Sequence, residues 1–262
     1  MRLDLSGCEE REIAAKAYLS RKDIEELILP ERTERIGNWA FAHMKKLERL
    51  IVPCRELILG KEILKGCDAL AYISVRERET QTDDAGCLLA AAIRLLGAQE
   101  LLTPPELGSR EWMARFDGTV CAFLERTDDS DFQPMWFGGE EDYDDNDTNI
   151  EQFRKKRRAE KLELTVLRLI HAQDLEDRAK TIYQEALAHL LTERECWQEL
   201  VCRFGTEAAL IPVLGNAGCL EDRESAMQML QDICPEGKAL LLQHYAGQEN
   251  GRENCFFSDL IL

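Results

Sequence analysis

A segment that repeats with a fixed period of 23 residues constrains the fold of this chain more than any other feature. Ile24-Glu-Glu-Leu-Ile-Leu-Pro30 returns as Leu47-Glu-Arg-Leu-Ile-Val-Pro53, and again, without the proline, as Leu70-Ala-Tyr-Ile-Ser-Val75. Between these copies, Ile36-Gly-Asn-Trp-Ala-Phe41 returns as Leu59-Gly-Lys-Glu-Ile-Leu64. Self-similarity at a period of about 20 to 29 residues is typical of a solenoid. The pattern predicts one short strand and one short helical return in each unit.

The repeated motif also indicates a family. Leu47-x-x-Leu50-x-Val52-Pro53, following Ile36-Gly-x-x-Ala-Phe41, resembles the bacterial BspA-type leucine-rich repeat, whose units read approximately L-x-x-V-x-I-P and then I-G-x-x-A-F. An upstream half-copy begins at Ile13 and has Ala14 in place of the glycine, so the resemblance covers about a quarter of the chain. It implies a leucine-rich solenoid and, in broad terms, an adhesive or partner-binding surface.

The apolar spacing predicts three stacked rungs, because side chains alternate between the two faces of a strand. The inward positions are Ile24, Leu27, Leu29, Leu47, Leu50, Val52, Leu70, Ile73 and Val75. The outward positions form two columns and are our candidate partner-binding residues: Glu26, Arg49 and Tyr72, then Ile28, Ile51 and Ser74. Ile28 and Ile51 would be apolar on a solvent face, which indicates either a contact surface or a cover supplied by another part of the chain.

Composition limits the classes of partner and compartment. The 262 residues include 50 acidic and 33 basic side chains, a net charge of −17, which argues against a nucleic-acid partner. The first ten residues lack the apolar core of a signal peptide, and no segment approaches the roughly 18 apolar residues of a membrane span. We therefore expect a cytoplasmic protein with no membrane partner, while secretion after loss of a leader stays open.

The ten cysteines include no C-x-x-C pair. Most of them lie in apolar helical surroundings, which favours buried free thiols over disulfides.

Helical patterns fill the remainder of the chain. Apolar residues at helical spacing predict helices over residues 87–96, 109–126, 148–171 and 179–190, then one ending near residue 204 that a capping box, Thr192-x-x-Glu195, would open. Two apolar segments about 30 residues apart, Thr206–Leu214 and Glu236–His244, resemble a degenerate pair of ankyrin-like helix hairpins.

Together these patterns predict an α+β fold: a short leucine-rich-repeat solenoid of about three rungs with parallel strands, followed by an all-α helical array. We divide the chain into a repeat domain (1–78), a helical cap or connector (79–126), an acidic loop (127–148) and an all-α domain (149–262).

A sharp charge boundary lies near the border between the last two parts. Residues 127–153 hold ten acidic side chains and no basic one, and Arg154-Lys-Lys-Arg-Arg158 follows at once. Asp142-x-Asp144-x-Asn146 resembles the start of a calcium loop, but Asp147 stands where that loop has glycine and Phe153 where it has glutamate. We therefore predict a solvated acidic loop and a basic run neutralised by neighbouring acids.

The chain offers few groups for catalysis. Cys196, Cys202, His171 and His189 match no familiar zinc-ligand spacing, and His43 and His244 complete the small set of histidines. We predict no catalytic, cofactor or metal residue.

Three functions stay open. The leading hypothesis is a non-enzymatic module that presents its repeat and helical surfaces to another protein. The alternatives are an enzyme or ligand-binding protein with a site between the two domains, and a cation-binding protein acting through residues 128–151.

Overall fold

The computed structural model describes residues 1–76, 78, 83–132, 149–207, 209–220 and 245. The chain forms two compact units. The first contains residues 1–125 and 171–176, and the second contains residues 126–170 and 177–262. No helix among the described residues is long and apolar enough to cross a bilayer.

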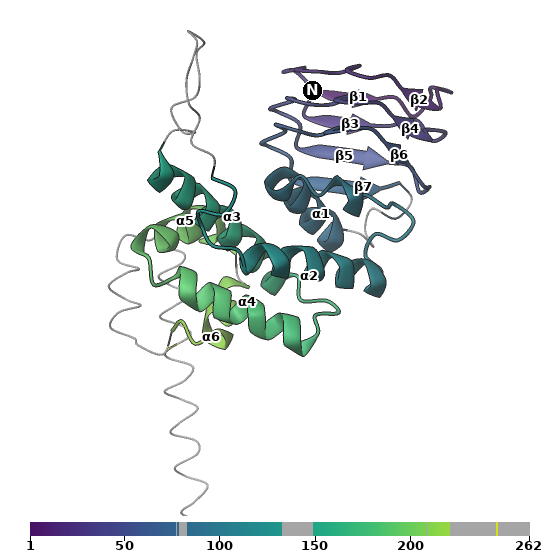
Figure 1. Cartoon of the computed structure of the whole chain (residues 1–262). Coiled ribbons are helices and arrows are strands. Elements are labelled where there is room, and N and C mark those ends of the chain that lie inside the picture. Colours follow the sequence, from purple (N-terminus) through teal and green to yellow (C-terminus); the bar gives the residue numbers. More distant parts are fainter. Residues whose placement is uncertain (77, 79–82, 133–148, 208, 221–244, 246–262) are drawn as a thin grey trace, which may run out of the picture. The chain divides into compact units, whose positions relative to one another are not determined.

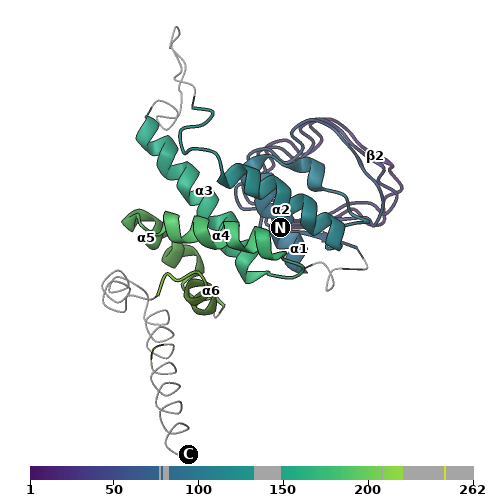
Figure 2. The ribbon, with the colours of Figure 1, turned by 60° about the horizontal axis from the view of Figure 1, so that its bottom comes forward.

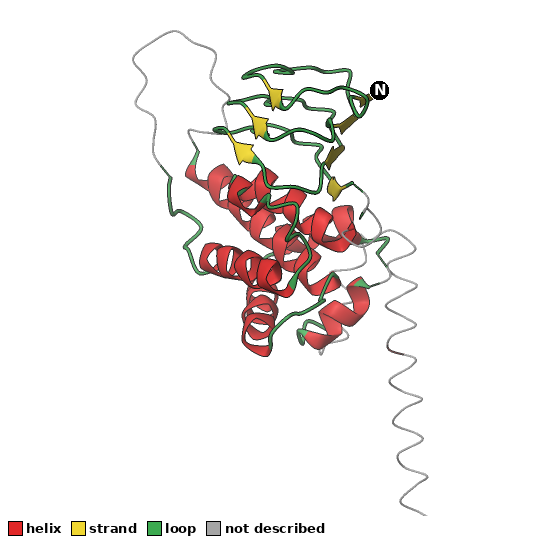
Figure 3. Ribbon diagram, turned by 90° about the vertical axis from the view of Figure 1, so that its right-hand side faces the viewer, coloured by secondary structure: helices red, strands yellow, loops and turns green. Residues whose placement is uncertain are grey.

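The first unit begins with a parallel solenoid of about three turns (Figure 1). One sheet has the order β1-β3-β5-β7, formed by β1 (Arg2–Asp4), β3 (Glu26–Ile28), β5 (Arg49–Val52) and β7 (Tyr72–Val75). A second sheet has the order β2-β4-β6, formed by β2 (Glu12–Ile13), β4 (Arg35–Ile36) and β6 (Ile58–Leu59). The two sheets lie on opposite sides of the stack, whose turns superimpose when viewed along its axis (Figures 2 and 3).

The strand register follows the predicted apolar columns. Leu27 pairs with Leu50 and Leu50 with Ile73. All nine predicted inward residues are at most 1% exposed. The core of the solenoid is therefore the apolar column that the 23-residue period predicts.

The solenoid of about three turns differs from the sequence pattern in two details. The stack has a fourth strand, β1, in which Leu3 pairs with Leu27 at a separation of 24 residues. This extra residue breaks the 23-residue period, so the repeat pattern does not extend to the first strand. The returns are not helical either, because each contains a two-residue strand followed by turns.

The second outward column is buried. Ile28 is 5% exposed, Ile51 is 7% exposed and Ser74 is 1% exposed. One part of the cover is Arg76, which leaves the sheet on the same face as Ser74 because it follows that residue by two positions. Its Nη2 donates to the Leu29 carbonyl at 3.0 Å, two turns away, so the side chain crosses the intervening turn. Of the two interpretations of Ile28 and Ile51, the structure favours a cover supplied by the chain.

Three helical elements follow the solenoid in the same unit. The predicted helices are α1 (Asp83–Leu96), which packs against β7, and α2 (Arg110–Leu124); the short 3-10 helix η2 (Gln99–Leu101) lies between them. Ser109 begins α2, since its hydroxyl accepts a hydrogen bond from the Trp112 amide at 3.1 Å. Trp112 is fully buried, stacks on Phe116 and donates its indole N–H to the Leu101 carbonyl at 2.8 Å. These contacts give the helices a core of their own.

The second unit is helical in its described part. It contains α3 (Ile150–Ile170), α4 (Asp177–Leu190), α5 (Arg194–Phe204) and α6 (Leu210–Asn216). Their buried faces share one apolar cluster that includes Leu162, Leu187, Trp197 and Leu214. The helices before and after residue 192 are confirmed, but Thr192 does not open α5. Its hydroxyl instead donates to the His189 carbonyl at 2.7 Å, so the predicted capping box is wrong.

Acidic residues at positions 128–131 and at the start of α5 neutralise the basic run of α3. Asp128 accepts from Arg158 Nε at 2.8 Å and from Lys161 Nζ at 2.9 Å. Asp129 pairs with Arg154 at 3.5 Å. Further pairs join Lys155 to Glu195, Arg157 to Asp131 and Arg158 to Glu193. The predicted self-neutralisation is confirmed for these residues, whereas Asp142, Asp144 and Asn146 lie outside the described residues, as does the segment Glu236–His244.

Candidate functional site

A column of side chains on the return side of the solenoid leads to the candidate site. Lys16, Trp39 and Glu62 occupy equivalent positions in successive turns, and all three have left-handed backbones, with φ of 60°, 54° and 49°. The Lys16 ammonium lies 5.5 Å from the centre of the Trp39 ring, and Trp39 Nε1 donates to Glu62 Oε2 at 2.9 Å. Glu62 also pairs with Lys65 Nζ at 2.7 Å. The column is thus linked from turn to turn by its side chains.

These left-handed positions are unusual because they hold no glycine. A non-glycine residue in this region costs of order 1 kcal/mol, and such strain gathers at functional sites. A second column, formed by Ser20, His43 and Gly66, also has positive φ angles. Only its last turn has glycine at this position. The retained Lys16, Trp39 and Glu62 side chains therefore make this face a candidate for function.

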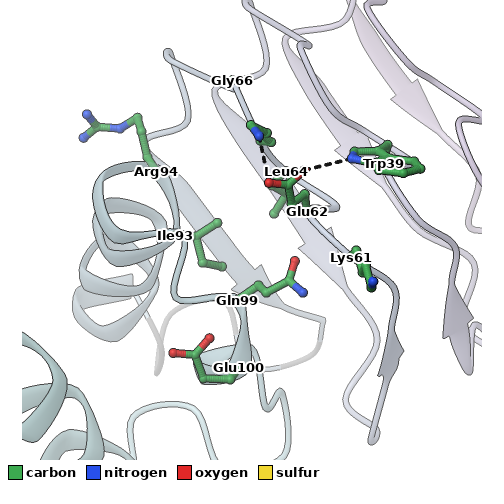
Figure 4. A pocket seen from close by; sticks show the side chains of 11 residues that line it. Trp39, Lys61, Glu62, Leu64, Gly66, Ile93, Arg94, Gln99 and Glu100 are labelled. Atoms are coloured by element: carbon green, nitrogen blue, oxygen red, sulfur yellow. Dashed lines mark hydrogen bonds and ion pairs between the residues drawn. The ribbon is translucent and has the colours of Figure 1, made fainter. Parts of the chain in front are cut away.

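A cavity of about 610 Å³ opens beside the third turn. Trp39, Lys61 and Glu62 line it on the solenoid side, and Ile93 and Gln99 line it on the helical side (Figure 4). The remaining lining residues are Leu64, Lys65, Gly66, Arg94, Gly97 and Glu100. Apolar Leu64 and Ile93 are buried, while charged side chains of both signs surround them. All of these residues belong to the first unit.

Gln99 connects the helices to the solenoid at this cavity. In the first two turns, a direct backbone bond closes the return, from Ala17 to Ala14 at 3.2 Å and from Ala40 to Gly37 at 3.3 Å. In the third turn, the Gln99 side chain stands between the equivalent groups. Its amide donates to the Gly60 carbonyl at 2.8 Å and accepts from the Ile63 N–H at 3.1 Å.

Replacing Gln99 with leucine is expected to lower the free energy of unfolding by about 1.5 kcal/mol, since it leaves two partly buried backbone groups unpaired. Gln99→Glu should lose less, because a carboxylate still accepts from Ile63 while it cannot donate to Gly60. Urea unfolding measures both changes. Glu100→Gln, next to it and exposed, is the matched control; an equal loss in all three variants would contradict the bridging role.

Hydrogen bonding sets the electrostatics of the cavity rim. The Lys65 ammonium, and then the Trp39 indole N–H, donate to Glu62 and lower the pKa of its carboxyl. Glu62 is therefore an anion at neutral pH. It is an acceptor for a ligand's donor groups rather than a proton donor.

The predicted partner-binding residues are only partly accessible. Glu26, Arg49 and Tyr72 form one column on the strand side, with Arg2 above them, as the strand register requires. Arg2 pairs with Glu26 at 3.8 Å, and the Arg49 guanidinium lies 5.4 Å from the centre of the Tyr72 ring. Ile28, Ile51 and Ser74 are buried beside this column and are not part of an exposed surface. Binding by these residues stays a prediction.

The sequence does contain a signal for the return column. Aligning the returns at the 23-residue period places Lys16, Trp39 and Glu62 at one position. The prediction of a helical return obscures this signal, because a right-handed helix would not give that position the left-handed backbone that sets the three side chains in a column.

The described cysteines are free thiols, but fewer are buried than predicted. Cys67 and Cys196 are buried, whereas Cys8, Cys54 and Cys202 are exposed. Burial raises the pKa of Cys67 and of Cys196 to about 11, so neither is a ready nucleophile at neutral pH. A smaller cavity of about 390 Å³ between α3 and α5 is lined by Cys196 and Cys202.

The histidines do not assemble a metal centre in the described part of the chain. No group of three or more His, Cys, Asp or Glu side chains is placed there to hold a metal ion. His171 Nδ1 instead lies 3.0 Å from Asp84 Oδ1. His43 occupies a left-handed position on the exposed return.

Comparison of the chain with profiles of protein families, with curated proteins and with solved structures gave no match.

Proposed function

We propose that this chain is a non-enzymatic protein–protein interaction module built on BspA-type leucine-rich repeats, and that its binding surface is the return face around the cavity. One observation supports this most directly. Trp39 stands at the rim of an open cavity, in a left-handed conformation, held by Lys16 on one side and Glu62 on the other. A positioned aromatic side chain beside a cavity is a common anchor of protein interfaces.

The chemistry of the cavity fits a peptide segment. Buried Leu64 and Ile93 would contact an apolar side chain of the partner, while Lys61 and Glu100 are exposed and carry opposite charges. Interfaces commonly surround an apolar centre with a polar rim. The backbone beneath is a hydrogen-bonded ladder, so binding would order little of it.

The strand-side column is the secondary contact in this proposal. Glu26 and Arg49 already have partners in neighbouring turns, and exposed ion pairs contribute little to affinity. We expect Tyr72 to matter less than Trp39. We also expect the protein to act in the cytoplasm, where free thiols such as Cys54 and Cys202 persist.

A second candidate is binding of a small molecule in the same cavity. Its volume of about 610 Å³ lies within the usual range of ligand pockets. It lies between the repeats and the helices that follow them, within the first unit, and so differs from the predicted site between the two domains. Thermal-shift screening of metabolites against the full chain would separate this candidate from a peptide-binding function.

Quantitative capture of proteins from the source cell, followed by affinity measurement with the recovered partner, tests the proposed surface. Trp39→Ala is expected to weaken binding by at least about tenfold, as loss of an interface anchor does. Tyr72→Ala, an aromatic truncation on the strand side, should change affinity by less than about threefold. Melting temperatures of both variants close to that of the original chain would show that folding is intact.

A larger loss of affinity for Tyr72→Ala than for Trp39→Ala would place the interface at the strand-side column instead. A partner that binds both variants as tightly as the original chain would contradict the proposal for either face.

A further inference from the structure

The two ends of the solenoid differ. At the β7 end, α1 covers the last strand so closely that a Cβ on Gly86 would lie 2.5 Å from the Ile73 carbonyl oxygen. At the β1 end, β1 pairs with β3 and no other described strand pairs with it. Met1 is 51% exposed and Leu19 is 39% exposed at this end, and Leu3 and Leu5 are only half-buried. A sheet edge that no described strand pairs with, next to partly exposed apolar side chains, is a surface that favours association.

The backbone direction at this edge is determined by the bonds to β3. The Met1 carbonyl accepts from Glu25 at 2.8 Å, and the Leu5 N–H donates to Ile28 at 3.0 Å. Because successive residues of a strand point their N–H and C=O groups to opposite sides, those of Arg2 and Asp4 point away from β3. They form a short, regular set of donors and acceptors along the open edge.

The sequence of β1 selects one symmetric pairing. An antiparallel pair of identical strands has its two-fold axis at one residue. An axis at Arg2 or at Asp4 would place like charges opposite each other, which is destabilising. An axis at Leu3 places Arg2 opposite Asp4 of the second copy, twice, and lets each pair exchange both backbone hydrogen bonds. The two Leu3 side chains then meet as the close, non-hydrogen-bonded pair, extending the apolar column from one stack into the other.

We propose that two copies of this chain associate through antiparallel pairing of their β1 strands, with the two-fold axis at Leu3. The local charge permits this approach. Residues 1–22 hold five basic and four acidic side chains, whereas the whole chain carries a net charge of −17. This end therefore carries none of the net negative charge of the chain, so two copies repel each other less there than the value of −17 suggests.

Sedimentation velocity of the full chain over about 1 to 100 µM tests the proposal. We expect reversible dimers. Arg2→Asp or Asp4→Arg alone should weaken dimerisation by about tenfold, because each turns two attractive cross-strand pairs into repulsive ones. The double variant Arg2→Asp/Asp4→Arg restores opposite charges and should dimerise within about threefold of the original chain.

Controls at other positions separate this effect from net charge. Arg35→Asp in β4 and Glu48→Arg before β5 make the same kinds of charge change away from the edge and should leave dimerisation unchanged. A monomer at every concentration would overturn the proposal. So would a dimer that both single variants leave intact, or one that the double variant fails to restore.

Discussion

Replacing Gly37 with alanine is expected to lower the free energy of unfolding by about 3 kcal/mol, the upper part of the range for overpacking a close-packed interior. A Cβ at this position would lie 2.4 Å from the Ala15 backbone nitrogen and 2.8 Å from the Ala15 Cα, in the turn above. Backbone atoms of a hydrogen-bonded ladder cannot move aside as a flexible side chain can. Urea unfolding followed by circular dichroism measures the loss.

Gly118→Ala is the control for Gly37→Ala. Gly118 lies within α2, where a Cβ would meet nothing within 4 Å, so alanine should stabilise the helix by about 1 kcal/mol. Gly60→Ala should behave like Gly37→Ala, since its Cβ would lie 2.5 Å from the Asn38 nitrogen. Similar stabilities for Gly37→Ala and Gly118→Ala would mean that the turns are not stacked as described.

The same contact explains why the first turn has alanine at the equivalent position. The Cβ of each later residue points at the return before it, and the described chain places no earlier return beside Ala14. The glycine of the repeat motif is thus a requirement of stacking, and it applies from the second return onward.

Asp128→Ala is expected to destabilise the second unit by about 2 kcal/mol, because removing one partner of a partly buried charge pair leaves the other charge with less compensation. Among the described residues, Lys161, whose side chain is 8% exposed, would keep its bond to the Arg126 carbonyl, and Arg158 would lose the nearer of its two carboxylate partners. Asp129→Ala, whose carboxylate pairs with Arg154 at the surface, is the control and should change stability by less than about 1 kcal/mol.

Lowering the pH should remove the stabilisation by the Asp128 carboxylate in the original chain as well. Desolvation raises the pKa of Asp128, but the hydrogen bonds and charges of Arg158 and Lys161 outweigh it and hold that pKa below the ordinary value of 3.8. The stabilisation is therefore complete above pH 3.8 and is lost as the pH falls through the lower folded pKa. Urea titrations from about pH 6 downward should show a shallower loss for Asp128→Ala than for the original chain. If the free energy of unfolding fell equally with pH in both proteins, this would contradict the pairing of Asp128 with Arg158 and Lys161.

The solenoid core could be predicted from the sequence because burial repeats with the period of the chain. Leu27, Leu50 and Ile73 fall on one column, and alternation along each strand makes their neighbours Leu29, Val52 and Val75 inward as well. The long helices were predictable for a similar reason, since Trp112, Phe116 and Val120 recur on one buried face.

The candidate site could not be predicted in the same way. Its return column depends on left-handed backbones at Lys16, Trp39 and Glu62, residues that give no glycine signal for such a turn. Its cavity depends on Gln99, a helical residue that follows the last repeat and inserts between Gly60 and Ile63. Contacts such as those of Gln99, which join the repeats to a later helical element, leave no periodic trace. The burial of Ile28 and Ile51 likewise depends in part on Arg76, whose reach across two turns is a property of the folded stack.

The Gln99 bridge has a consequence for how such a protein can evolve. It ties the last return to the helices, so any unit duplicated after Leu64 would have to offer Gln99 a carbonyl and an N–H equivalent to those of Gly60 and Ile63. A 23-residue duplication between Pro30 and Pro53 would instead keep both termini of the stack intact, since each new turn offers its neighbours the same ladder of amides and carbonyls. Growth by internal duplication is thus unrestricted in the middle of the array, whereas at the helical border the new last return must leave room for Gln99 between its carbonyl and its N–H.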